Sequence, residues 1–138
     1  MIKVGNGLLL KIDFADGGVC EIDRTFLVIH VDKNKIHLLN VSSVKGKERK
    51  LGFASNKIIK RYMPPFKKPS FIKKDALYIL PNDKWVEDKI LCSNRCINPL
   101  ELKEIIDEYE IYRENNEVYI KECTIDYLLE KNKEKILI

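Results

Sequence analysis

The chain has 138 residues, of which 45% are hydrophobic and 33% are charged, proportions that are typical of a soluble globular domain and exclude an intrinsically disordered protein. This length suffices for one domain with a single hydrophobic core, and no apolar run approaches the roughly 18 residues of a membrane-spanning helix. Because the N-terminal sequence lacks the layout of a signal peptide, we expect a cytoplasmic protein without contact to a membrane.

The net charge of +4 conceals a strong segregation of charge along the chain. Residues 33–74 contain 13 basic residues and one acidic residue, whereas residues 1–32 and 75–138 are both net acidic. Such a basic segment is the pattern expected of a protein that binds a phosphate backbone. A solvated lysine-rich face is the alternative interpretation of the charge alone.

The N-terminal third is predicted to form short β-strands. Residues 7–14 are a short apolar strand that ends near the turn sequence ADGG. Residues 24–31 and 35–42 are rich in branched and aromatic side chains, and the DKN sequence between them predicts a hairpin with a tight turn.

The polar segment 43–69 has a weak helical pattern at residues 56–62, before prolines that favour an extended chain. Strand character returns at residues 70–80, and residues 84–91 suit a further strand. These expectations leave the basic segment mostly in loops between strands.

The period of the apolar pattern then changes from two to about 3.6 residues. Asn98 is a predicted N-cap, with Pro99 at the first helical position and Glu101 at the third, and an apolar stripe on an acidic helix follows to residue 113. The tail is predicted to contain a short strand and then a short helix that starts near Thr124.

Four cysteines are present, but the CxxxC spacing of Cys92 and Cys96 lacks the second pair that would favour a zinc site. We therefore expect free thiols, no metal and no cofactor, with a metal site or a disulfide as lesser alternatives. His30 and His37 lie in apolar strand-like runs, and neither has an evident partner for a nucleophilic triad.

Several short strands followed by one amphipathic helix predict a mainly β (α+β) fold, a small β-barrel with the helix packed on it. We expect one domain, with the barrel and helix in residues 1–113 and a C-terminal extension in residues 114–138. The extension has two open roles, which are to widen a dimer interface or to occupy the basic segment as a brake.

Five segments in this order resemble the MazF/PemK toxins of bacterial toxin–antitoxin systems: GLLLKIDFADGG, DRTFLVI, LLNVSSV, PPFKKPSFIKKDALYIL and INPLELKEIIDEY. The resemblance extends from about residue 5 to residue 113. It implies an SH3-like barrel, a homodimer and a metal-independent, sequence-selective endoribonuclease. Such an enzyme cleaves single-stranded RNA by attack of the 2′-hydroxyl, leaves 2′,3′-cyclic phosphate and 5′-hydroxyl ends, and is neutralised by a cognate antitoxin.

The resemblance also implies the catalytic residues. Arg24 stands in the place of the family's catalytic arginine, and Ser42 stands where the family usually has threonine. Lys73 and Asp75 stand where one branch has an Arg-x-Asp pair, and lysine lacks the bidentate fork of arginine. Each has a structural alternative: an ion pair of Arg24 with a neighbouring acid (Asp23 or Glu21), turn capping by the serines, and a lysine partner (Lys73 or Lys74) for Asp75.

The basic segment is the expected RNA track, and an acidic antitoxin segment would compete for the same charge. Tyr62 and Phe66 are candidates for stacking on bases, whereas Phe71 suits the core better. The candidate RNA-binding residues are Ser43, Lys45, Lys47, Arg49, Lys50, Arg61, Tyr62, Phe66, Lys67 and Lys68.

Two other functions remain open at this point. The serine at position 42 and the lysine at position 73 are compatible with a barrel that binds nucleic acid without cleaving it. A toxin of the same fold that inhibits DNA gyrase is the other alternative, although the acidic tail matches it poorly.

Overall fold

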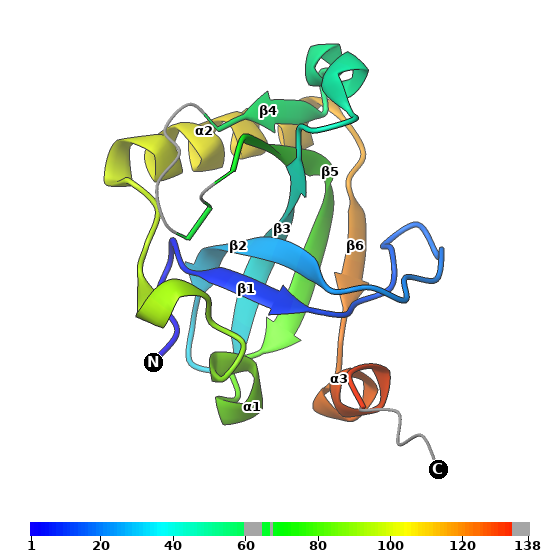
Figure 1. The fold of residues 1–138 in the computed structure, drawn as a ribbon, viewed down its shortest axis with the longest axis vertical. Helices are drawn as coiled ribbons and strands as arrows, with labels where there is room; N and C mark the ends of the chain where they lie inside the picture. Colours follow the sequence, from blue (N-terminus) through cyan, green and yellow to red (C-terminus); the bar gives the residue numbers. More distant parts are fainter. Residues whose placement is uncertain (60–64, 67, 134–138) are drawn as a thin grey trace.

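The structure is a computed structural model that describes residues 1–59, 65–66 and 68–133. Its elements are a mostly antiparallel sheet and α-helices that pack on it (Figure 1). The strands are β1 (Gly7–Leu10), β2 (Arg24–Val31), β3 (Lys35–Ser43), β4 (Asn56–Ile58), β5 (Ser70–Pro81) and β6 (Tyr119–Glu122). The helices are α1 (Lys84–Glu87), α2 (Pro99–Asn115) and α3 (Ile125–Lys131), with 3-10 turns at Glu48–Gly52 and Cys92–Asn94. In this part of the chain, no helix has both the length and the apolar character that a membrane crossing requires.

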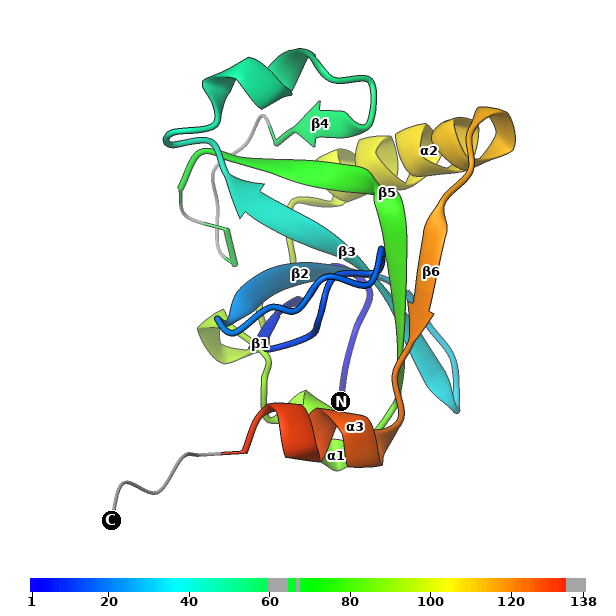
Figure 2. The same ribbon diagram turned by 90° about the vertical axis from the view of Figure 1, so that its right-hand side faces the viewer.

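The strand order is β1-β2-β3-β5-β4, with β6 added in parallel to β5. Figure 2 shows that β5 bends sharply, so that its first half lies along β4 and its second half along β6. Within the described ranges the sheet stays open, because β1 pairs with β2 and otherwise makes only isolated bridges, at Asn6–Cys96 and Leu8–Ile90. The structure therefore gives a strongly bent sheet, and closure into the predicted barrel is not seen.

Both faces of the sheet are covered, because successive strand residues point to opposite sides. Phe26 and Val28 of β2 belong to one buried cluster, which Leu128 of α3 and Val86 of α1 complete. Leu27 belongs to a second cluster on the other face, under α2. The consecutive apolar residues Phe26, Leu27 and Val28 follow from this arrangement, since all three are fully buried.

The predicted hairpin is confirmed, with β2 at the expected bounds and β3 one residue longer. The first strand is shorter than predicted and ends at Leu10. Beyond that point Lys11 turns its backbone toward Asn132, with an N–H to Oδ1 distance of 2.8 Å, so the chain leaves the β1–β2 ladder.

Two local predictions were wrong. Residues 84–91 begin with helix α1 instead of a strand, because the Asp83 carboxylate accepts the Trp85 N–H (2.8 Å) and caps a helical turn. The helical pattern at residues 56–62 gives strand β4 instead, since pairing with β5 outweighs weak local propensity. Residues 60–62 of that stretch lie outside the described residues.

The predicted C-terminal helix is confirmed as α2. The Asn98 side chain accepts the N–H groups of Leu100 (2.9 Å) and Glu101 (3.3 Å), and Ile105 and Tyr109 are buried against the second cluster. The strand and helix of the tail are confirmed as β6 and α3, with Thr124 as N-cap. The tail thus contributes both a strand and core side chains to the same fold.

Candidate functional site

A pocket of about 290 Å³ lies where β2 begins and β3 ends. The antiparallel register pairs Thr25 with Val41, and Asn40 with Lys73, which brings three strands together at this point. Among its lining residues are five of the predicted site residues: Arg24, Ser42, Ser43, Lys47 and Lys73. Asp23 is the acidic residue that lines the same pocket.

Arg24 is the most enclosed of these side chains, with 9% of its surface exposed. Its Nη2 donates to the carbonyl oxygens of Ile12 (2.7 Å) and Asp13 (3.2 Å) and to the hydroxyl of Tyr78 (3.3 Å). The guanidinium also lies over the ring of Phe14, 4.4 Å from its centroid. These contacts fix one side of a planar cation at the base of the pocket.

The Nε of the guanidinium is not engaged by the described residues. Its Nε is buried and has no hydrogen-bond partner, and no carboxylate of the described chain lies within 4.0 Å of its nitrogens. The proposed ion pairs with neighbouring acids are wrong, since Asp23 lies 3.8 Å from Lys11 and Glu21 lies 4.0 Å from Lys131. A buried N–H without an acceptor is rare, so the arrangement favours an acceptor supplied by a ligand.

Ser42 is held by a basic neighbour from the following loop. Lys47 donates to its Oγ at 2.9 Å, so this oxygen acts as an acceptor and its own proton is left to donate. Ser43 is exposed and lines the same pocket. Hydroxyl and ammonium groups together form a surface that suits the oxygens of a phosphate.

Lys73 adds a third cation whose protonation is perturbed. Burial lowers the pKa of Lys73 below its usual value, Asp75 acts in the opposite direction, and Lys50, Arg24 and Lys47 lower it further. The proposed ion pair of Asp75 with a lysine is not formed, because neither Lys73 nor Lys74 lies within 4.0 Å of its carboxylate. Lys74 instead lies over the ring of Tyr112, 5.2 Å from its centroid.

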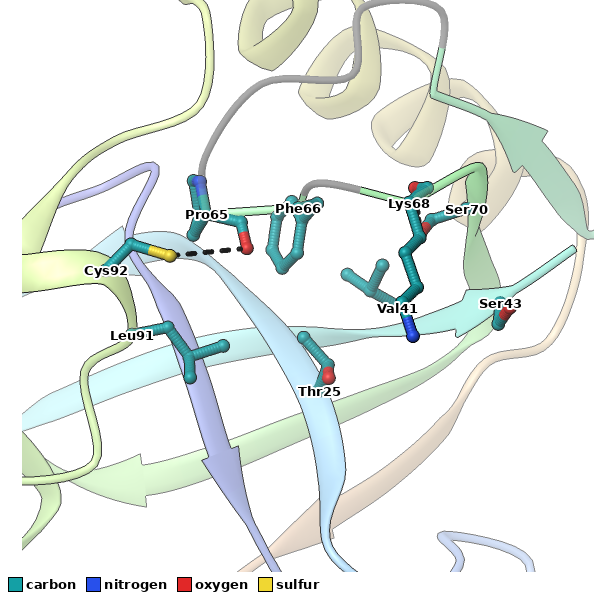
Figure 3. Close-up of a pocket in the computed structure, with 9 residues that line it drawn as sticks. All are labelled: Thr25, Val41, Ser43, Pro65, Phe66, Lys68, Ser70, Leu91 and Cys92. Atoms are coloured by element: carbon teal, nitrogen blue, oxygen red, sulfur yellow. Dashed lines mark hydrogen bonds between the residues drawn. The ribbon is translucent and has the colours of Figure 1, made fainter.

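The pocket continues into two neighbours along the same edge. One of about 300 Å³ shares Thr25, Val41 and Ser43 with it, and Figure 3 shows Lys68 extending across this second pocket toward the strand that carries Thr25. A third pocket is lined by Ser43, Lys45 and Lys68. Ser43 lines all three, so lysines and hydroxyls follow one another along a groove.

The remaining predicted residues fall in different places. Phe66 is 4% exposed and packs in the second cluster, but it also lines the second pocket, so its stacking on a base stays a prediction. Phe71 is in the core, as expected. Arg49 is exposed and Lys50 is half-buried near Lys73. Arg61, Tyr62 and Lys67 lie outside the described residues.

Several residues that form or support the pocket were not predicted from the sequence. Asn40 is 6% exposed, and its Nδ2 donates to the Thr25 carbonyl at 2.9 Å, which ties β2 to β3 beside the pocket. An asparagine within the apolar run KIHLLNVS is the signal that would have found it, since a buried amide needs a partner. Phe14 and Tyr78, which hold Arg24, resemble ordinary core residues in sequence.

The described residues were also compared with the requirements of a metal site, a disulfide and a histidine-based site. Over residues 1–59, 65–66 and 68–133, no group of three or more His, Cys, Asp or Glu side chains is placed to hold a metal ion. The four cysteines are free thiols. His30 and His37 lie with ring centroids 4.7 Å apart, and neither lines the pocket around Arg24.

In comparisons with known proteins, no family model matches the chain, and no curated protein matches it either.

Proposed function

We propose that the chain is an endoribonuclease toxin that cleaves single-stranded RNA at the pocket around Arg24. The observation that carries the proposal is a buried arginine with an unpartnered Nε–H, in a pocket that two further cations and two serine hydroxyls line. The resemblance to the MazF/PemK toxins supplies the reaction. The bent sheet with α2 packed on it would then be their SH3-like barrel.

The reaction requires three kinds of assistance. The 2′-oxygen attacks the adjacent phosphorus, the bond from phosphorus to the 5′-oxygen breaks, and the products are a 2′,3′-cyclic phosphate and a 5′-hydroxyl. A base takes the proton of the 2′-hydroxyl, donors stabilise the phosphorane, and an acid protonates the leaving 5′-oxygen.

The residues of the pocket suit these roles. Arg24 would donate its unpartnered Nε–H to a nonbridging phosphate oxygen, and Ser42 would donate its hydroxyl proton to the same phosphate. Lys73 is the candidate base, because its lowered pKa increases the fraction of neutral amine. Lys47 would donate to the phosphate from the loop. Asp75 does not line the pocket, so we assign it an electrostatic effect on Lys73.

The groove formed by the three pockets would carry the RNA on either side of the cleaved bond. The same cations would bind an acidic segment of a cognate antitoxin, which explains inhibition by competition. A homodimer, which the resemblance implies, is part of this proposal. The function requires neither a cofactor nor a metal.

A barrel that binds RNA without cleaving it is the competing function. One observation favours it: the pocket contains neither histidine, so cleavage depends on Lys73 as the proton acceptor. Lysine is an uncommon base for this step, since its neutral form must be populated.

The test is incubation of the purified protein with a long single-stranded RNA in EDTA, followed by mapping of the fragment ends. We expect discrete cuts with 5′-hydroxyl ends that are lost in Arg24→Ala and in Ser42→Ala. Arg113→Ala is the matched control, because Arg113 lies on α2 in an ion pair with Glu110 (3.5 Å). Binding without cuts at high protein concentration would favour the non-catalytic barrel, and inhibition of DNA gyrase without cuts would favour the other toxin.

A further inference from the structure

Helix α3 and its C-cap residue Asn132 contact the chain that leaves β1. In Figure 1, α3 lies beneath this chain. Asn132 forms two hydrogen bonds with the backbone of Lys11: its Oδ1 accepts the N–H (2.8 Å) and its Nδ2 donates to the carbonyl (3.0 Å). This side chain therefore replaces the strand partner that Lys11 lacks.

Asp13, two residues further, is held by the same helix. The Asp13 N–H donates to the Tyr127 hydroxyl, and that hydroxyl donates to the Asp13 carboxylate, both at 3.0 Å. The ammonium of Lys131 lies 2.7 Å from the other carboxylate oxygen. The bond from Lys131, the largest contribution, and the Cys20 N–H lower the pKa of Asp13 to about 2, so the carboxylate is charged throughout the neutral range.

The segment held in this way is the one that orients Arg24. The carbonyl oxygens of Ile12 and Asp13 accept from Nη2 of Arg24, so residues 11–13 contact both the C-terminal segment and the arginine. Nothing else in the described chain fixes these two carbonyls by a hydrogen bond. A shift of the segment would turn the guanidinium and redirect its free Nε–H.

We propose that Tyr127, Lys131 and Asn132 form a brace that positions Arg24 for catalysis through residues 11–13. The inference rests on the proposed function and gives the C-terminal extension a role within it. The extension then acts from behind the pocket, which differs from the two roles considered from the sequence, a wider dimer interface and a brake in the groove. The three side chains are positioning residues and do not touch the RNA.

The experiment uses the full chain and two variants of the brace. Tyr127→Phe removes both hydrogen bonds to Asp13 but keeps the ring, which also lies 5.0 Å from the Lys121 ammonium. Asn132→Ala removes the contacts with Lys11. Glu130→Gln, an exposed change on the same helix, is the matched control. Thermal unfolding establishes that each variant is folded. If one of the two brace variants does not fold, the other still tests the proposal.

The first measurement needs no RNA cleavage. The buried Nε–H of Arg24 should exchange slowly with water and give its own signal in a proton–nitrogen NMR spectrum, which Arg24→Lys assigns by its loss. We expect this signal to shift or broaden in both brace variants and to stay in place in Glu130→Gln. An unchanged signal in the brace variants would overturn the proposal.

The second measurement is the kinetics of RNA cleavage. We expect kcat to fall about 10- to 100-fold in each brace variant, with KM nearly unchanged, because misplacement of a catalytic group affects the transition state most. In an Arg24→Lys background, Tyr127→Phe should have no further effect on kcat. An undiminished further loss in that background, or an unchanged kcat despite a shifted signal, would contradict the brace. If the wild type cleaves no RNA, the ribonuclease proposal fails, while the Arg24 signal still decides the brace.

Discussion

At the scale of single residues, the unusual feature is an arginine that is buried without an acid. Burial of an unpaired charge is unfavourable, and Arg24 is stabilised instead by carbonyl oxygens and by the face of Phe14. Its Nε keeps an unused N–H beside the pocket. A buried N–H without an acceptor is rare in native structures, which makes this group a candidate for contact with a ligand.

Lys73 leads to an expected pH dependence of cleavage. Its pKa lies below the usual 10.5, and only the neutral amine can accept a proton, so the cleavage rate should rise with pH and level off above that lowered pKa. In Lys73→Arg the rise should be lost, because arginine stays protonated. Single-turnover rates measured across the alkaline range check this, and a rate that falls with pH would exclude Lys73 as the base.

Asp13 leads to an expected loss of stability in acid. Its pKa in the folded protein is about 2, compared with a usual 3.8, so its contribution is complete above pH 3.8 and is lost as the pH falls toward 2. In Asp13→Asn, the free energy of unfolding should change less over this interval than in the wild type. Urea unfolding at several pH values measures the difference. Asp126→Asn, an exposed acid on α3, is the control and should keep the wild-type slope.

At the scale of elements, α3 contributes to the core as well as to Arg24. Leu128 is fully buried in the first cluster, and β6 extends the sheet beside β5. The extension therefore cannot be removed without exposing apolar surface that the N-terminal strands also contribute.

We expect Leu128→Ala to lower the free energy of unfolding by about 2–5 kcal/mol, the usual cost of a cavity at a buried leucine. Leu129→Ala on the same helix is the control, since Leu129 is 46% exposed. Urea unfolding can be followed by the fluorescence of Trp85 on α1 and by circular dichroism. Coincident transitions of the two probes would show that the extension and the rest of the fold unfold as one cooperative unit. An earlier transition seen by circular dichroism alone would contradict this.

At the scale of the whole molecule, the basic segment 33–74 supplies the lysines of the groove and also contacts the acidic helix α2. Among the described residues, the ammonium of Lys57 lies 3.0 Å from Glu108 and 4.0 Å from Glu104, so the acidic helix α2 contacts the basic segment. Lys47 and Lys73 line the pocket around Arg24, and Lys45 and Lys68 line the third pocket. In the proposed function, these lysines attract the phosphates of RNA.

We expect the affinity for single-stranded RNA to fall steeply with salt, by a slope of about 0.7 in the logarithmic plot for each phosphate that a cation neutralises. Lys68→Ala should reduce the slope by about that amount, because Lys68 lines two of the three pockets. Lys103→Ala is the control, since Lys103 pairs with Asp107 on α2 at 2.8 Å. Equal slopes for both variants would show that the RNA follows another surface.

Local signals in the sequence determined the hairpin of β2 and β3, the start of α2 at Asn98 and the start of α3 at Thr124. Each depends on residues close in the chain, namely a turn or a side chain that caps the next backbone N–H groups. The charge segregation was also evident, because it needs only the composition of residues 33–74.

Only the tertiary structure decided the rest. Residues 56–58 became a strand because β5 offered a partner, and Phe66 became a core residue because a cluster formed beneath it. Contacts between residues more than a hundred positions apart, such as Tyr127 with Asp13, leave no pattern in a single sequence. They depend on the way that β6 returns the chain along β5, since pairing at that distance is set by packing of the whole fold and not by neighbouring residues.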